Sequence, residues 1–247
     1  KKRPTWRRLL TEAVCGLAPA GLGVSSVAIP LSATKLYLDG IQVDQGFRTQ
    51  FLTRMTETMS NQDMNYVDMP SFYPIGWFWL GGRMANLLNM PGWEVYQPWA
   101  LVSLAAAGSA LVPLWRRITG SLPAATAIAL VTTAVILTMV PEEPYAAVVA
   151  MGVPAAAVLG YRAMHGSWTS TIAVALYLGA SACFYTLYTG IMALTMIVLA
   201  FIAFIAMGRG KRTVKPFVHL VAMGVGSICI ALLSWGPYLF ALFTASE

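Results

Sequence analysis

The run Leu9–Leu31, LLTEAVCGLAPAGLGVSSVAIPL, is almost entirely apolar and carries a single charged side chain, Glu12. About 20 consecutive apolar residues are enough for a helix to cross the hydrocarbon core of a bilayer. Basic residues precede the run, as in a secretory signal peptide, but the run is too long and no small-residue cleavage site is evident. We therefore predict a membrane span, which Pro19 and Pro30 should kink or end.

The rest of the chain repeats this pattern. Of its 247 residues, 57% are hydrophobic and 11% are charged, whereas a soluble domain carries about 25% charged residues. Seven apolar runs can be distinguished, at about 9–31, 98–115, 123–140, 145–161, two within 168–207 that turn near 186–189, and 217–240. The sequence predicts an all-α, polytopic transmembrane helix bundle of about seven spans, with a single domain over residues 1–247. All three cysteines lie within these runs, which argues against a disulfide framework or a metal set.

The basic residues gather on one side of the expected bundle. With the N-terminus in the cytoplasm, 12 of the 16 lysine and arginine residues fall on the inner side, as the positive-inside rule requires. This arrangement holds only if the Trp-rich segment Tyr73–Met90 lies in the membrane interface as a helix instead of crossing. The acidic residues other than Glu12 fall on the outer side or at the C-terminus. We expect a multi-pass protein of the plasma membrane with an acidic site on its outer face.

Most acidic residues lie in the first outer loop, about 32–97. Asp44 heads an expected amphipathic helix, and Arg48 follows four residues later, where it can pair with Asp44 on one helix face. A carboxylate at the outer mouth of the bundle is suited to act as a general base, although an acid at a helix N-terminus also serves as a cap. Asp39 precedes Gly40 and fits a turn as well as a binding role.

A second acidic element is the short segment Pro141–Pro144, whose Glu142 and Glu143 fit a solvated turn or a second wall of the same site. Two carboxylates from separate loops can share a cation or divide base and binding roles. Tyr185 and Tyr188, at the expected outer end of the fifth and sixth spans, are candidate hydrogen-bonding residues of the cavity. No Walker loop, dinucleotide glycine pattern or serine nucleophile elbow occurs, so the sequence does not favour nucleotide-dependent chemistry.

The order of these parts resembles the polyprenyl-phosphate-sugar glycosyltransferases of the GT-C superfamily. In those enzymes a first span precedes an outer loop with a catalytic acid, an interfacial helix and a second span that ends in basic residues. The matching segments are Val43–Phe47 (VDQGF) at the acid motif, Tyr73–Trp77 (YPIGW) at the His-Pro-Pro-like motif, Pro141–Tyr145 at the second acidic loop, and Phe184–Gly190 at the later turn. More closely, the whole chain resembles AftA-type galactan arabinofuranosyltransferases. Members continue into further spans and a C-terminal soluble region, so the chain resembles their N-terminal transmembrane portion.

This resemblance implies an inverting transfer of arabinofuranose from decaprenyl-phosphoryl-arabinofuranose to a galactan hydroxyl in cell-wall arabinogalactan synthesis. It implies Asp44 as the base, and Glu142 and Glu143, with Asp39, as residues that position the acceptor or a cation. An apolar groove beside the interfacial helix would hold the prenyl chain. The candidates for binding the donor phosphate are the outward-facing basic residues Lys35, Arg48, Arg54 and Arg83. Gln45 departs from the Asp or Glu common in the superfamily, and a divalent cation is compatible with the sequence but not required by it.

Three alternatives stay open. A related transferase of the same superfamily could move another sugar, such as mannose, and the chain could be a transporter or flippase of lipid-linked sugars. A transporter should carry charges within its spans, but nearly all charges here lie at span ends, which favours a transferase. The third alternative is a structural subunit that docks partners through its outer loop. The net charge of +6 marks one membrane face and does not indicate a nucleic acid partner.

Overall fold

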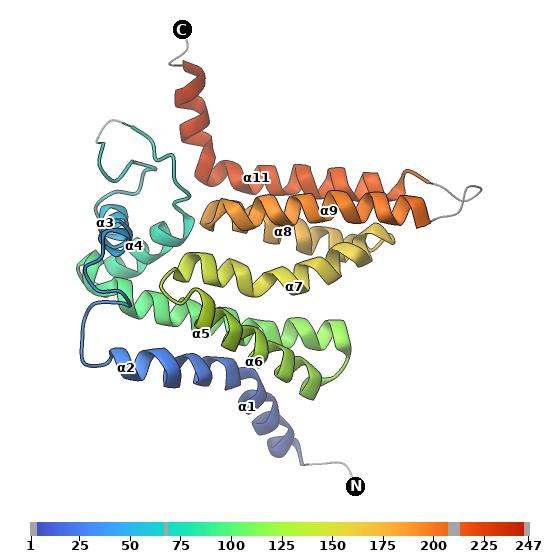
Figure 1. Ribbon diagram of the computed structural model, residues 1–247, viewed down its shortest axis with the longest axis horizontal. Coiled ribbons are helices and arrows are strands. Elements are labelled where there is room, and N and C mark those ends of the chain that lie inside the picture. Colours follow the sequence, from blue (N-terminus) through green and yellow to red (C-terminus); the bar gives the residue numbers. More distant parts are fainter. Residues whose placement is uncertain (1–3, 67–68, 207–212, 245–247) are drawn as a thin grey trace. The chain divides into compact units, whose positions relative to one another are not determined.

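The computed structural model describes residues 4–66, 69–206 and 213–244, and every regular element in those ranges is a helix (Figure 1). The elements are α1 (Thr5–Gly23), the π-helix η1 (Val24–Ala28), α2 (Ile29–Leu31), α3 (Val43–Glu57), α4 (Gly76–Leu88), α5 (Gly92–Thr119), α6 (Leu122–Met139), α7 (Pro144–Met164), α8 (Trp168–Phe184), α9 (Thr186–Ala206) and α11 (Lys215–Thr244). The predicted all-α class is confirmed. The basic residues at 1–3 and 209–212, which enter the predicted topology, lie outside the described residues.

Several helices have the length and composition of membrane spans. Six described segments qualify: Thr5–Leu31, Gly92–Thr119, Leu122–Met139, Pro144–Met164, Thr186–Ala206 and Lys215–Thr244. The apolar helix α8 has 17 residues, which is at the lower limit for crossing a bilayer. The polytopic membrane class is thus confirmed, while the number of seven spans stays a prediction. Helix α4 has 13 residues, about 20 Å of helix, and is too short to cross alone.

The second long helix extends beyond the predicted span at both ends. The sequence predicts this span at about Pro98 to Trp115. In the structure α5 already begins at Gly92, after Pro91 in an extended conformation, and Pro98 lies inside the helix. Glu94 and Gln97 therefore belong to the first turns of α5, and the predicted outer loop of about 32–97 stays a prediction.

The chain forms two compact units, the first from Lys1–Gln50 and Met84–Gly152, the second from Phe51–Arg83 and Val153–Glu247. The sequence predicts a single domain over residues 1–247, and this division into two compact units does not test that prediction. In the first unit α1 packs on α5 and α6. Gly108 permits a close approach there, because a Cβ at this position would lie 2.9 Å from the hydroxyl of Thr133 and 3.1 Å from the Cβ of Pro19.

Proline also shapes the first span. Figure 1 shows α1 bending sharply away from the line of η1 and α2, and Pro19 is the proline inside α1. Its ring displaces the carbonyl of the preceding turn, which agrees with the predicted kink. Pro30 lies in the first turn of α2, which ends at Leu31. The loop that follows is tied to α5 by Gln97, whose Nε2 lies 2.8 Å from the carbonyl oxygen of Leu36.

In the second unit α8 packs against α11, and both contact α9. The core here is rich in methionine, and its almost fully buried methionines are Met164, Met192, Met196 and Met223. Close packing of α8 on α11 depends on Gly179, because a Cβ there would lie 2.5 Å from the Cβ of Ile230. Figure 1 shows that α11 bends before its C-terminal end, and Pro237 lies inside this helix.

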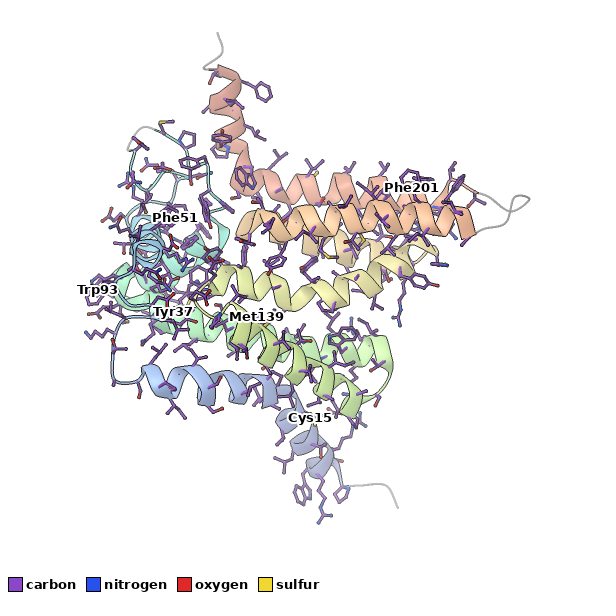
Figure 2. All side chains as sticks on the ribbon, viewed as in Figure 1. Cys15, Tyr37, Phe51, Trp93, Met139 and Phe201 are labelled. Carbon is purple, nitrogen blue, oxygen red and sulfur yellow. The ribbon has the colours of Figure 1, made fainter. Side chains whose placement is uncertain are left out.

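Helix α4 packs against residues 51–57 of α3 in the same unit. The ring of Phe51, labelled in Figure 2, lies 4.7 Å from the ring centroid of Phe78 and 6.1 Å from that of Tyr73. Gly82 faces the backbone of α3, and a Cβ on Gly82 would lie 2.5 Å from the carbonyl oxygen of Met55. A backbone carbonyl in a helix cannot move aside as a flexible side chain can. The close contact between α4 and α3 therefore requires a residue without a side chain at position 82.

Gly82→Ala is expected to destabilise the second unit by about 1–3 kcal/mol, the usual cost of overpacking. The measurement is thermal unfolding of the purified chain in detergent, followed by circular dichroism. Gly190→Ala is the matched control, because a Cβ at Gly190 in α9 would meet no described atom within 4 Å other than those of its chain neighbours and its own helix backbone. Equal midpoints for the two variants would contradict the proposed close contact of α4 with α3.

Candidate active site

The predicted base stands at the start of α3. Two successive turns lead into this helix, with the amide of Gly40 bonded to the carbonyl of Tyr37 and the amide of Gln42 bonded to the carbonyl of Asp39. Asp39 has a φ of 66° and Gly40 a φ of 60°, so both use the left-handed conformation that Gly adopts freely and Asp tolerates. The sequence leaves a turn role and a binding role open for Asp39. The backbone of Asp39 forms the predicted turn, and its binding role stays a prediction.

Asp44 lies in the first turn of α3, and its side chain is exposed. Among the described residues, no hydrogen bond or ion pair engages its carboxylate. An acidic residue in the first turn is a favourable partner for the positive end of the helix dipole. The structure therefore presents a carboxylate that is accessible and uncommitted, as a general base must be before substrate arrives.

The second acidic element, Pro141–Pro144, contacts this end of α3. Gln45 donates from Nε2 to the carbonyl oxygen of Glu142 at 3.1 Å, and Arg48 donates from Nη1 to the same oxygen at 3.4 Å. Arg48 Nη2 lies 2.5 Å from the carboxylate of Glu143. We call these contacts of Gln45 and Arg48 with the 142–143 backbone and side chains the hairpin clasp. Through it the structure brings the two acidic elements together.

Arg48 is buried, and its guanidinium group is bound by residues of the hairpin and by Tyr145. The residue is 5% exposed, and its Nε donates to the hydroxyl of Tyr145 at 3.3 Å. Burial alone would lower the pKa of Arg48, but Tyr145 and Glu143 outweigh this effect, so that the pKa lies above its usual value. The i, i+4 spacing predicts a pair between Asp44 and Arg48, and the structure instead pairs Arg48 with Glu143. Its guanidinium is thus occupied by the protein and is not free for a donor phosphate.

The two glutamates of the hairpin differ in their surroundings. Glu143 is bound to Arg48, whereas no hydrogen bond or ion pair engages the carboxylate of Glu142 in the described part of the chain. The hydroxyl of Tyr37 donates to the carbonyl oxygen of Pro141 at 2.7 Å. Burial and the charge of Glu142 both raise the pKa of Tyr37, so this phenol stays a neutral donor. Glu142 is therefore the hairpin acid that is available to a ligand.

The other predicted phosphate-binding cations have protein partners of unequal strength. Lys35 forms an ion pair with Glu94 at 2.8 Å, and its side chain is 70% exposed. Exposed ion pairs contribute at most about 1 kcal/mol, so Lys35 can exchange its partner readily. In the second unit, Arg54 contacts Gln62 at 2.9 Å, and Arg83 donates to backbone carbonyls of α3 and the loop after it. The Nε atoms of Arg54 and Arg83 are buried without a hydrogen-bond partner among the described residues.

An apolar groove lies beside α4, entirely within the second unit. It has a volume of about 460 Å³ and is bounded by the start of α4, the loop before it, the end of α8 and the middle of α11. The residues that line it on the loop before α4, on α4 and on α8 include Ile75, Gly76, Trp79, Leu80, Cys183 and Phe184. The resemblance implies a prenyl-binding groove beside this helix, and that role stays a prediction.

Hydrogen bonds hold the two walls of this groove together. Asn61 Nδ2 lies 2.5 Å from the carbonyl oxygen of Ser234, and the hydroxyl of Ser234 accepts from the amide of Ile75 at 3.2 Å. Trp79 donates from Nε1 to the carbonyl of Met59 at 3.1 Å. Beside the groove, the predicted pair Tyr185 and Tyr188 have ring centroids 5.4 Å apart, at the junction of α8 and α9.

Residues 2–247 match the family described as arabinofuranosyltransferase N terminal. The chain belongs to this family. The galactan 5-O-arabinofuranosyltransferase of Corynebacterium glutamicum is 58% identical over 247 residues, which cover 100% of this chain and 37% of that relative. The relative of the same name from Mycolicibacterium smegmatis is 40% identical over 90% of this chain and 36% of its own length. The relative from Mycobacterium tuberculosis is also 40% identical, over 87% of this chain and 34% of its own length. The chain thus spans about a third of the length of these relatives.

Some residues of this arabinofuranosyltransferase N-terminal chain contribute to the candidate site without having been assigned a role from sequence. Gln45 is 2% exposed and donates a hydrogen bond that an ionised carboxylate could not donate, so the departure at this position has a structural use. Asn61 and Ser234 join the walls of the groove. Ser234 carried a signal, because it is a polar residue within an apolar helix; Asn61 carried none. No group of three or more His, Cys, Asp or Glu residues forms a metal site in the described ranges.

Proposed function

We propose that the chain is the N-terminal transmembrane part of a galactan 5-O-arabinofuranosyltransferase, which transfers arabinofuranose from decaprenyl-phosphoryl-arabinofuranose to galactan. The observation that carries this proposal is the family match over residues 2–247, together with the relative of that name at 58% identity. The site faces the outer side of the plasma membrane in this proposal, as the asymmetry of the basic residues favours.

Asp44 is the proposed base. It takes the proton of the acceptor hydroxyl while that oxygen attacks the anomeric carbon of the donor and the bond from this carbon to the phosphate oxygen breaks. The lipid phosphate leaves with the bonding electron pair, and attack from the opposite face inverts the anomeric centre. The exposed and unbonded carboxylate of Asp44 on the first turn of α3 supports this assignment.

The hairpin clasp positions the base and the acceptor in this proposal. Arg48 fixes the first turns of α3 against the hairpin through Glu143, and so acts as a positioning residue. Glu142, whose carboxylate is uncommitted among the described residues, binds acceptor hydroxyls or a divalent cation. Asp39 presents a further exposed carboxylate in the turn before α3. Tyr185 and Tyr188 are proposed to donate hydrogen bonds to the sugars.

The groove beside α4 is proposed to receive part of the decaprenyl chain. Its lining of aliphatic, aromatic and methionine side chains suits an isoprenoid, which offers no hydrogen-bonding groups. Lys35 is the proposed counter-charge for the leaving phosphate, because its exposed ion pair with Glu94 costs little to break. Arg54 and Arg83 are further proposed phosphate-binding cations.

The test is a transfer assay in membranes that contain the protein at its natural length. Decaprenyl-phosphoryl-arabinofuranose and a galactan acceptor should yield arabinosylated galactan, while a decaprenyl-phosphoryl-mannose donor should yield no mannosylated product. Transfer of mannose instead would support a related transferase, and movement of the donor across sealed vesicles without any sugar transfer would support a flippase. Either result would overturn the proposal.

Glu142→Gln is expected to raise the KM for galactan about 10- to 100-fold while leaving the unfolding midpoint unchanged, because in this proposal its carboxylate contacts the acceptor and not the protein. Loss of one charged hydrogen bond corresponds to about 1.5–3 kcal/mol. Glu143→Gln is the matched control one residue along, and we expect it to lower the unfolding midpoint by breaking the clasp. The same stability loss in both variants, without a KM effect, would show that the hairpin is only a turn.

A further inference from the structure

A second cavity lies within the second unit, at the other end of its helices from the apolar groove. It has a volume of about 320 Å³ and lies where α7 and α9 end and α11 begins (Figure 1). Its lining is Met164, His165, Ala203, Ala206, Thr213 and Lys215. The sequence places this end of the helices on the cytoplasmic side, and the function proposed above uses none of these residues.

The charge of this cavity is positive, and no acidic side chain is among the described residues that line it. Between residues 144 and 246 the sequence contains no aspartate or glutamate. Lys215 lies at the start of α11, and no hydrogen bond or ion pair from the described residues engages its ammonium group. The group rests on the turn between α7 and α8, where a Cβ on Gly166 would lie 2.4 Å from Lys215 Nζ. The chain therefore places a cation at the cavity and leaves its counter-charge to a ligand.

His165 offers a second polar group to the same cavity. Its Nδ1 lies 2.8 Å from the carbonyl oxygen of Tyr161, and because a carbonyl only accepts, Nδ1 carries the hydrogen. The Nε2 atom is then the ring position left for a ligand. The hydroxyl of Thr213 also lines the cavity. The ammonium group of Lys215 and the hydroxyl of Thr213 can donate to an oxyanion such as a phosphate diester, and Nε2 of His165 can accept from a hydroxyl of the ligand.

The surface around the cavity is apolar. A water-soluble anion has no need of such a surface, whereas a lipid with acyl chains does. The last turns of α9 expose Phe201, Ile202 and Ile205, and the first turn of α8 exposes Trp168. Aromatic side chains at span ends are typical of the level of lipid headgroups. Basic pockets between transmembrane helices on the cytoplasmic side bind anionic lipid headgroups. The cavity thus joins a cationic head site to surfaces that suit acyl chains.

We propose that this cavity binds the headgroup of an anionic phospholipid, with Lys215 against the phosphate diester and the acyl chains along the exposed apolar face of α9. The lipid supplies the negative charge that the 144–246 segment lacks. The proposal is independent of sugar transfer, since it concerns the other end of the helices.

The test is native mass spectrometry of the detergent-purified chain, titrated with phosphatidylglycerol or with phosphatidylcholine of the same acyl chains. We expect phosphatidylglycerol to bind more tightly. A basic side chain near an anionic lipid surface contributes about 1 kcal/mol, so Lys215→Gln should weaken phosphatidylglycerol binding about fivefold. Lys215→Arg should retain it. Ala206→Trp, which fills the cavity without changing charge, should also weaken it.

Arg117→Gln is the matched control, because Arg117 is an exposed cation on the same predicted membrane face that lines no described cavity. It should change phosphatidylglycerol affinity less than twofold. Equal affinity for the two lipids, or equal losses in Lys215→Gln and Arg117→Gln, would overturn the proposal in favour of general surface attraction. Displacement of the lipid by millimolar glycerol phosphate or inorganic phosphate would overturn it in favour of a water-soluble phosphate ligand.

Discussion

Asp44→Asn is expected to lower arabinose transfer by about 10²- to 10⁴-fold, the usual contribution of a general base. Asparagine keeps the size of the side chain but cannot take a proton from the acceptor hydroxyl. Because the carboxylate of Asp44 is exposed and bonds to no described residue, its loss should not change the unfolding midpoint. The measurement is incorporation of labelled arabinose into galactan by membranes with matched protein levels.

Asp39→Asn is the control for this prediction, because Asp39 is also an exposed acid of the same loop, five residues earlier. We expect it to retain transfer within about tenfold of the parent protein, since asparagine also tolerates the left-handed conformation of this turn. Normal transfer by Asp44→Asn would remove Asp44 from the mechanism. A larger loss in Asp39→Asn than in Asp44→Asn would move the base to the turn.

Arg48→Met is expected to destabilise the first unit by about 3 kcal/mol. Removal of one partner of a buried ion pair costs about 3–5 kcal/mol, and the lower end applies here because the side chain of Glu143 is 25% exposed. The clasp also loses the donors to the carbonyl of Glu142 and to Tyr145. The measurement is chemical unfolding of the purified chain in detergent, compared with the parent protein.

A double-mutant cycle with Glu143→Gln separates the clasp from other effects of the substitution. If Arg48 acts through Glu143, the two single changes should be strongly non-additive, with a coupling of about 1 kcal/mol or more. Arg48→Lys distinguishes the clasp from phosphate binding. A clasp role predicts lower stability and a lower kcat with an unchanged KM for the lipid donor, while a raised donor KM at full stability would restore the predicted phosphate role.

The candidate acids could be singled out from the sequence because charges are rare in this chain. Asp44 and the adjacent Glu142 and Glu143 stand out among apolar runs, and a chain that is 11% charged offers few alternatives. The partner of Arg48 could not be found in this way. The local i, i+4 rule suggested Asp44, whereas the observed partner, Glu143, is 95 residues away. Local spacing describes only one helix, and it carries no information on which loop packs against it.

The sequence by itself determined that this is an all-helical membrane protein, because the length of an apolar run is a local property that the bilayer reads directly. It also predicted a short Trp-rich helix apart from the long apolar runs, and α4 has 13 residues; its place in the membrane interface stays a prediction. Only the tertiary structure decided which acid each cation binds, which of two neighbouring glutamates stays uncommitted, and that α4, α8 and α11 enclose an apolar groove. These features depend on distances between segments far apart in the chain, and such distances are set by packing.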